Sequence, residues 1–290
     1  VHTLATKRSI KTGISPLAAF LLSTAMRVGP GNMIGVTGAI AAGGPGALFW
    51  MWISAFFGMA TAFMEGTLAQ LFKEKRGNTF VGGLPFYARK LCGNKVWVGT
   101  ILSVIYIVYA LMCLPAQGFN VVTSIGAIAG LAENVQIPVQ STFTYVVSVL
   151  VIILVAFMAF GGIRRVSHWA DILVPVMAVI YVVTAILLIV SNLGSVPWFF
   201  KAVFEGAFKP EAIFGGFFGT ALLQGVKRGL MSNEAGQGTI TMAAASAEAH
   251  HPCEQGIISA LGVFLDTHVI CTMTGFIIVM AHEWAVPKNP

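Results

Sequence analysis

The segment Gly29-Pro30-Gly31-Asn32 lies in the middle of an apolar run that extends from about residue 14 to residue 40. A membrane helix of this length is ordinarily continuous, but proline lacks a backbone N–H group and glycine loses the most conformational entropy in a helix. The released N–H and C=O groups find no partners in hydrocarbon, so they must face another protein segment or a polar cavity. An interruption of this kind is typical of an ion or solute site near the membrane midplane.

The composition is that of an integral membrane protein. Hydrophobic residues make up 57% of the 290 residues and charged residues only 10%, whereas soluble domains carry about 25% charged residues. The net charge of +6 does not indicate a nucleic-acid partner, because the basic residues lie between apolar runs without interleaved aromatic residues. We predict one transmembrane domain, residues 1–290. Seven apolar runs are long enough to cross a bilayer, at about 14–42, 46–71, 96–131, 142–160, 169–193, 212–247 and 256–281.

Basic residues concentrate in alternate connections between these runs. They precede the first run and are dense in residues 73–95 and at Arg164 and Arg165, which predicts that these ends and the N-terminus are cytoplasmic. The glycine-rich connection 73–95 is expected to be a cytoplasmic loop with a short surface helix.

A second anomaly lies in residues 215–238, which are rich in glycine and carry Lys227, Arg228 and Glu234 inside an otherwise apolar run. Charges at membrane depth are costly unless they are paired or face a cavity. We therefore expect Lys227 and Arg228 to pair with Glu234, Glu65 or Asp266, and we expect this sixth run to be a broken helix. Matching interruptions in the first helix of each repeat are typical of inverted-repeat transporters.

Several motifs occur in a fixed order along the chain. They are Gly29-Pro30-Gly31-Asn32, residues 43–52 (GGPGALFWMW), Gly58-Met59-Ala60-Thr61 with Glu65, residues 228–236 (RGLMSNEAG), His251-Pro252 with Gln255-Gly256, and Phe264-Leu265-Asp266-Thr267 with Ile270-Cys271-Thr272. In order and spacing this series resembles the sodium:alanine symporter family, the alanine or glycine:cation symporters.

The resemblance implies an all-α, leucine-transporter-like fold of five-plus-five inverted helices, as in the amino acid-polyamine-cation superfamily, with helices 1 and 6 interrupted. The first repeat would cover about 14–193 and the second would begin at about 212–281. Three further core helices would lie beyond Pro290, so we expect this chain to be a fragment, truncated to about seven transmembrane helices.

The resemblance also implies a secondary active transporter that carries alanine or glycine into the cell with sodium by alternating access. Its partners would be the amino acid, the sodium ion and the lipid bilayer of a bacterial or archaeal plasma membrane, with no cofactor besides the co-transported sodium. The alternative is a symporter or exchanger of the same fold for a different amino acid or coupled to protons. A channel and an intramembrane enzyme fit less well, because no symmetric pore ring and no nucleophile elbow are visible.

The first break predicts two neighbouring sites. The half-helix that begins near Asn32 directs free N–H groups and a positive dipole end at the midplane, which suits the carboxylate of an amino acid. Gly31 would let the ligand approach the backbone. The carbonyls released around Met26, Arg27 and Gly29 suit a sodium ion, which prefers oxygen ligands. Asn32 could equally cap the second half-helix.

The third run is expected to contribute Gln117, Phe119 and Asn120 to the substrate site. The family usually has Gln-x-Asn here, but Phe119 occupies the position of the asparagine, and Asn120 lies about 100° further round the helix. Gln117 and Asn120 could instead form interhelical hydrogen bonds.

At the second break we expect substrate contacts from Gly219, Thr220, Gln224 and Gly225. Structural or gating roles are expected for Glu65, Lys227, Arg228, Asn233, Glu234 and Asp266. For Asp266 the alternatives are an ion pair with Lys227 or Arg228 and a role in ion coupling. Asn233 and Glu234 could cap a half-helix or close a cytoplasmic gate.

Overall fold

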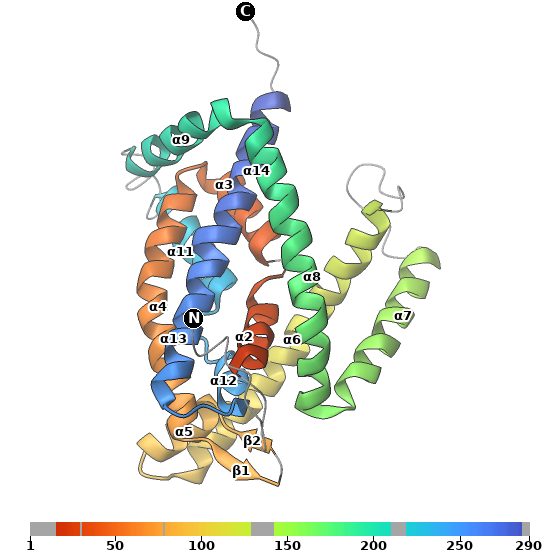
Figure 1. Cartoon of the computed structure of the whole chain (residues 1–290), viewed down its shortest axis with the longest axis vertical. Coiled ribbons are helices and arrows are strands. Elements are labelled where there is room, and N and C mark those ends of the chain that lie inside the picture. Colours follow the sequence, from red (N-terminus) through yellow and green to blue (C-terminus); the bar gives the residue numbers. More distant parts are fainter. Residues whose placement is uncertain (1–15, 30, 78, 129–141, 210–218, 286–290) are drawn as a thin grey trace, which may run out of the picture.

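The computed structural model describes residues 16–29, 31–77, 79–128, 142–209 and 219–285, and nearly all of them are helical (Figure 1). Five of the described helical segments are long and apolar enough to cross a membrane: Ala47–Leu71, Val96–Gly126, Thr142–Ala159, Arg165–Ser191 and Pro252–Ala281. This confirms a helical membrane protein. The other two expected spans, 14–42 and 212–247, are the two that were predicted to be broken.

The described elements follow one another along the chain as helices with a single small sheet. They are α2 (Pro16–Arg27), η1 (Gly31–Gly35), α3 (Val36–Gly43), α4 (Ala47–Leu71), β1 (Glu74–Arg76), β2 (Thr79–Val81), α5 (Leu84–Leu91), α6 (Val96–Ile128), α7 (Thr142–Ala159), α8 (Gly162–Ser191), η3 (Leu193–Ser195), α9 (Val196–Phe208), α11 (Thr220–Asn233), α12 (Thr241–Ser246), α13 (Pro252–Val263), η4 (Phe264–Cys271) and α14 (Thr272–Ala285).

The first expected span is interrupted at the predicted place. Helix α2 ends at Arg27, and the chain bends at Val28 and Gly29 before it continues as the π-helical turn η1 and then α3. Pro30 lies outside the described residues. The sixth expected span is also divided, because α11 ends at Asn233, where Glu234 takes a left-handed conformation with φ 53°, and α12 begins only at Thr241. The part of this span at 212–218 lies outside the described residues.

Helices α11 and α13 pack along α4, which stands at one side of the bundle in Figure 1. Glycines allow these close contacts. A Cβ atom on Gly225 of α11 would collide with the backbone of Ala47, and one on Gly66 of α4 would collide with Ser259 of α13. Small residues that bring helix backbones together are the usual basis of packing in membrane proteins, where lipid removes the hydrophobic drive for association.

Helices α6 and α7 stand to one side of this bundle (Figure 1). Helix α7 has no buried residue, and its side chains are almost all apolar. Helix α9 lies across one end of the bundle, and α5 with the β1–β2 hairpin lies at the opposite end. The short surface helix expected in the connection 73–95 is therefore present as α5, whereas the hairpin and α9 were not predicted.

Lys73 follows the end of α4 and ties it to α12. Its ammonium group donates to the side-chain oxygen of Gln70 (2.7 Å) and to the carbonyl of Ala247 (2.6 Å). Burial lowers the pKa of Lys73 from 10.5 to about 8, against an opposing effect of Glu248.

This pKa predicts a pH dependence of stability. Between about pH 8 and pH 10.5 the unfolded chain binds more protons at Lys73 than the folded chain does, so the stability contributed by this position rises with pH across that window. The test is the unfolding temperature of the wild type and of Lys73→Met, measured at several pH values between 8 and 10.5. We expect the unfolding temperature of the wild type to rise with pH relative to that of the variant. Parallel pH curves for the two proteins would contradict the prediction.

Candidate functional site

Asn32 lies at the first break and is almost completely buried, at 2% exposure. Its side-chain oxygen accepts the N–H of Gly29 (3.0 Å), and its own N–H donates to the carbonyl of Gly29 (3.1 Å). Asn32 thus bridges the break locally through two hydrogen bonds to Gly29, which precedes it. A helix N-cap would instead accept an N–H from a residue that follows it. The side-chain nitrogen of Asn32 donates to Asp266 in a hydrogen bond of 2.6 Å.

Asp266 is the centre of a buried polar group that joins three elements. Its carboxylate accepts hydrogen bonds from Asn32 of η1, from the hydroxyl of Ser232 in α11 (2.9 Å) and from the hydroxyl of its neighbour Thr267 (3.0 Å) in η4. Asp266 has no exposed surface. A carboxylate in such a place needs several hydrogen bonds to offset its desolvation, and these three satisfy that need.

Two further side chains complete this group. The sulfur of Cys271 lies 3.2 Å from the hydroxyl of Ser232 and 3.5 Å from the side-chain nitrogen of Asn32. Asn233 is fully buried and donates to Thr267 at 3.4 Å. Together with Arg27 we call these residues the junction cluster: Arg27, Asn32, Ser232, Asn233, Asp266, Thr267 and Cys271.

Arg27 supplies the positive charge of the junction cluster. Its side chain is buried and donates to the carbonyl of Asn233 (3.0 Å) and to the hydroxyl of Ser23 (3.1 Å). It lies within electrostatic range of the carboxylates of Asp266, Glu234 and Glu65. From the sequence only the backbone carbonyl of Arg27 was expected to have a role, as a sodium ligand.

The expected pairing of Lys227 and Arg228 with these carboxylates was wrong. Neither forms an ion pair with Glu65, Glu234 or Asp266 among the described residues. Lys227 is exposed, and Arg228 lies against Gly38 and contacts the sulfur of Met231 (3.7 Å). Lys227 points away because the buried face of α11 contains Gly225, Gly229 and Ser232, and a residue two positions from Gly225 and from Gly229 lies on the other side. Arg228 lies four positions before Ser232, on the same side of α11, but its side chain packs against α3 at Gly38.

The expected substrate residues of α11 have different surroundings. Gly219 is buried and has a left-handed φ of 48°, and Thr220 next to it is exposed. Gln224 is half-buried, whereas Gly225 lies in the tight contact with α4. The start of α11 also abuts the end of α3, because a Cβ on Gly43 would collide with Ala221. The two broken spans therefore meet in the structure.

The structure does not bring the expected residues of α6 to the junction cluster. Gln117 and Phe119 are exposed, and Phe119 retains 52% of its accessible surface. Asn120 is half-buried, and its carbonyl accepts the hydroxyls of Thr123 and Ser124 in its own helix. None of these three side chains has a hydrogen bond to another element within the part of the chain that the structure describes.

A second buried carboxylate lies at the end of α11. Glu65 of α4 is 7% exposed and accepts the backbone N–H groups of Gly236 (3.1 Å) and Gly238 (2.8 Å). Glu234 accepts the hydroxyl of Thr239 at 2.6 Å. These contacts shape residues 234–240, which we call the α11–α12 loop.

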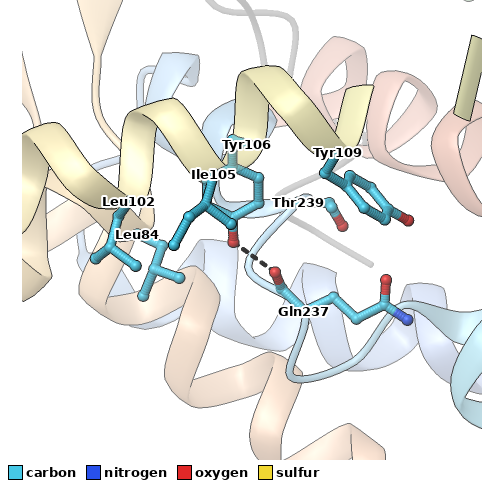
Figure 2. Close-up of a pocket in the computed structure, with 7 residues that line it drawn as sticks. All are labelled: Leu84, Leu102, Ile105, Tyr106, Tyr109, Gln237 and Thr239. Carbon is cyan, nitrogen blue, oxygen red and sulfur yellow. Dashed lines mark hydrogen bonds between the residues drawn. The ribbon is translucent and has the colours of Figure 1, made fainter. Parts of the chain in front are cut away.

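A cavity of about 280 Å³ lies on the other side of this loop (Figure 2). The hydroxyl of Tyr106 in α6 donates to the carbonyl of Gln237, as the dashed line in Figure 2 marks. The lining is mostly apolar and comes from α5, α6 and the α11–α12 loop: Leu84, Leu102, Ile105, Tyr106, Tyr109, Gln237 and Thr239.

Sequence reasoning singled out Asn32, Asn233 and Asp266 but missed Ser23, the Arg27 side chain, Cys271 and the specific roles of Ser232 and Thr267. The available signal was polar residues within apolar spans, as in Ser232-Asn233 and Asp266-Thr267. Such residues in membrane spans usually face the interior of the bundle.

The fold and the junction cluster define a multi-pass helical membrane protein whose first span is broken at a buried polar centre. The family model described as sodium:alanine symporter family matches residues 1–289. The chain therefore belongs to the sodium:alanine symporter family, a family of transporters, as the motif series predicted.

The chain is similar to several bacterial and archaeal proteins. It is 41% identical over 268 residues to the amino-acid carrier protein AlsT of Bacillus subtilis, covering 92% of this chain and 55% of AlsT. It is 42% identical over 280 residues to the protein named probable sodium/glutamine symporter GlnT of the same organism, covering 96% and 56%. It is 36% identical over 275 residues to the sodium/alanine symporter AgcS of Methanococcus maripaludis, covering 94% and 59%. The chain thus spans just over half the length of these relatives.

Proposed function

We propose that this chain belongs to a sodium-coupled symporter that moves a small neutral amino acid, alanine or glycine, into the cell by alternating access. The family assignment and the names of AlsT and AgcS support this proposal. The observation that carries it is the junction cluster, in which Asp266 joins the broken first span to α11 and η4. A buried polar centre at a helix break is the arrangement from which transporter sites are built.

The amino acid would bind beside the half-helix formed by η1 and α3. The free N–H groups and the positive dipole end near Gly31 suit its carboxylate. A Cβ atom on Gly31 would lie 3.9 Å from the carbonyl oxygen of Met231 and from the Cα atom of Ser232, so the backbone of Gly31 faces the last turn of α11 across a narrow space. We propose this space, beside Asn32, as the substrate site. The contacts expected from Gly219 and Thr220 would then require a second region at the start of α11, which abuts the end of α3 at Gly43.

Sodium would bind to backbone carbonyls on the other side of the break, at Met26, Arg27 and Gly29. The carbonyl of Gly29 accepts one hydrogen bond, from the N–H of Asn32, and a carbonyl oxygen retains a second lone pair. Both sites would then share one unwound segment, so that ordering by either ligand favours binding of the other.

We also propose a fold and a membrane orientation for this chain. A leucine-transporter-like inverted repeat, with residues 14–193 as the first five helices and residues 212–281 as the start of the second five, accounts for the break in the first and in the sixth expected span. The basic connections place the N-terminus in the cytoplasm and the protein in the plasma membrane.

The test is uptake of labelled alanine and glycine into proteoliposomes that contain the protein expressed from its complete gene. We expect saturable uptake driven by an inward sodium gradient and lost when potassium replaces sodium. Absence of saturable uptake of both amino acids with sodium would contradict the proposal. A second candidate, a symporter or exchanger for a different amino acid, is favoured by the name of GlnT. Inhibition of labelled uptake by unlabelled glutamine would favour this second candidate as to substrate. Uptake driven by a proton gradient without sodium would favour it as to the coupling ion.

One substitution tests the position of the substrate site. Gly31→Val places a branched side chain in the narrow space between η1 and α11, and we expect the KM for the amino acid to rise at least about tenfold while membrane insertion stays intact, since a small steric change in a binding site is worth roughly 1–3 kcal/mol. Kinetics of uptake at fixed sodium measure the change. An unchanged KM would move the site away from the break.

A further inference from the structure

Glu65 is a buried carboxylate without a cation in hydrogen-bond contact among the described residues. Its two oxygens are instead occupied by the backbone N–H groups of Gly238 and Gly236 in the α11–α12 loop. Both glycines have left-handed φ values, 83° for Gly236 and 74° for Gly238, which only glycine adopts readily. The loop is therefore folded so that two backbone donors converge on one carboxylate, and such charge-assisted hydrogen bonds are about twice as strong as neutral ones.

The loop that Glu65 holds is continuous with the junction cluster. It begins directly after Asn233, whose carbonyl accepts from Arg27 and whose side chain contacts Thr267. Ser232 precedes it and donates to Asp266. A displacement of the loop would therefore move the last turn of α11, and with it two side chains of the junction cluster.

The opposite side of the loop contacts α6 through the hydroxyl of Tyr106, and the cavity of about 280 Å³ lies next to this contact (Figure 2). Gly238 packs tightly against Tyr106 and Leu84, whereas Gln237 and Thr239 border the cavity. The side chains of these two residues therefore have space beside them, and the hydrogen bonds to Glu65 hold the loop backbone on the side of α4.

We propose that Glu65 is a positioning residue for transport: by holding the α11–α12 loop, it keeps Ser232 and Asn233 in place and so sets the affinity of the substrate site. This inference rests on the proposed function for its kinetic consequence. Its structural part, that Glu65 fixes the loop, is independent of what the protein transports.

The first test is amide hydrogen–deuterium exchange of the protein from the complete gene, followed by mass spectrometry of peptides that cover residues 234–240. In Glu65→Gln the side-chain NH₂ group replaces one acceptor, so only one of the two backbone N–H groups keeps its partner. We expect exchange in these peptides to be about tenfold faster, the effect of losing one charge-assisted hydrogen bond. Unchanged exchange would overturn the proposal, whether or not the protein transports alanine.

The matched control is Gln70→Ala on the same helix. Gln70 is also buried and polar, but its amide donates to the carbonyls of Ala244 and Ala247 beyond the loop. We expect this variant to lower the unfolding temperature without faster exchange at residues 234–240. Equal acceleration of loop exchange in both variants would make the Glu65 effect a general loss of stability and would overturn the proposal.

The second test is the kinetics of sodium-driven uptake. Glu65→Gln is expected to raise the KM for the amino acid about tenfold with Vmax within about twofold of the wild type, whereas a merely structural defect lowers the amount of active protein and hence Vmax alone. A fall in Vmax at constant KM would overturn the proposal. If the wild type shows no uptake, the proposed function fails and the exchange experiment still decides the role of Glu65.

Tyr106→Phe provides a variant that leaves the buried carboxylate intact. It removes the hydrogen bond to Gln237 from the half-buried side of the loop. We expect exchange at residues 234–240 and the KM to change in the same direction as in Glu65→Gln, by about threefold. A change in KM without a change in loop exchange would contradict the link between loop position and affinity.

Discussion

Asp266→Ala is expected to reduce sodium-driven amino acid uptake by at least about a hundredfold. The substitution removes three hydrogen bonds to a carboxylate, from Asn32, Ser232 and Thr267. Each such bond is worth about 1.5–3 kcal/mol, and the partners are left buried without acceptors. Loss of even two of them corresponds to about two orders of magnitude in an equilibrium constant. The first helix break, at Asn32, would then lose the hydrogen bonds through which Asp266 joins it to α11 and η4.

The measurement is the initial rate of uptake per molecule of folded protein, with size-exclusion chromatography as the check of folding. Asp171→Ala on α8 is the matched control, because it also removes a carboxylate from a helix but one whose Oδ1 atom has no hydrogen-bond partner among the described residues. We expect its uptake to stay within about threefold of the wild type. Equal losses of uptake rate in the two variants would contradict the prediction, because they would show that removing any carboxylate has this effect, whether or not it belongs to the junction cluster.

Gly225→Ala is expected to lower the free energy of unfolding by about 3 kcal/mol, the upper range for overpacking in a close-packed interior. The added Cβ would collide with the carbonyl of Ala47 and the side chain of Trp50 on α4. The Ala47 carbonyl belongs to the helix backbone and cannot rotate away, so α11 and α4 must separate. Because Ser232 lies on the same face of α11, the junction cluster would also lose its geometry.

Gly118→Ala is the matched comparison, since it is the same substitution within another helix, α6, of the same protein. A Cβ on Gly118 of α6 meets nothing within 4 Å. Alanine is about 1 kcal/mol better than glycine in a helix interior, so this variant is expected to be neutral or slightly stabilised. Thermal or denaturant unfolding of both proteins in the same detergent measures the difference. A Gly225→Ala protein as stable as Gly118→Ala would contradict the packing of α11 on α4.

The local features of the fold were predictable because they depend on short stretches of sequence. The apolar runs predicted a helical membrane protein, and Gly29-Pro30-Gly31 predicted the end of α2 near Arg27. The series of motifs predicted the family. In each case the determining property, helix propensity or transfer to hydrocarbon, belongs to consecutive residues.

The ion pairs predicted from the sequence were wrong. Lys227 and Arg228 are the basic residues nearest to Glu234 in the chain, yet Lys227 is exposed and Arg228 packs against Gly38 of α3. The buried cation within electrostatic range of the carboxylates is Arg27 instead. The hairpin β1–β2 and helix α9 were also missed. The residues of α6 that were expected to bind substrate do not contact the junction cluster in the described structure.

What the sequence by itself determined about this protein is its class, its family and the position of the first helix break. What only the tertiary structure decided is that the described part of the sixth span divides after Asn233, and which side chains meet there and at the first break. Asn32 and Asp266 are 234 positions apart in the chain, and Arg27 and Asn233 are 206 apart. Their contact depends on how α2, α11 and the α13–η4 segment are rotated and how closely they approach one another. Glycines such as Gly225 and Gly66 fix that approach, because they let α11 and α13 pack closely on α4. A sequence pattern gives the period of each helix, whereas the angle at which each one docks follows from packing the whole bundle.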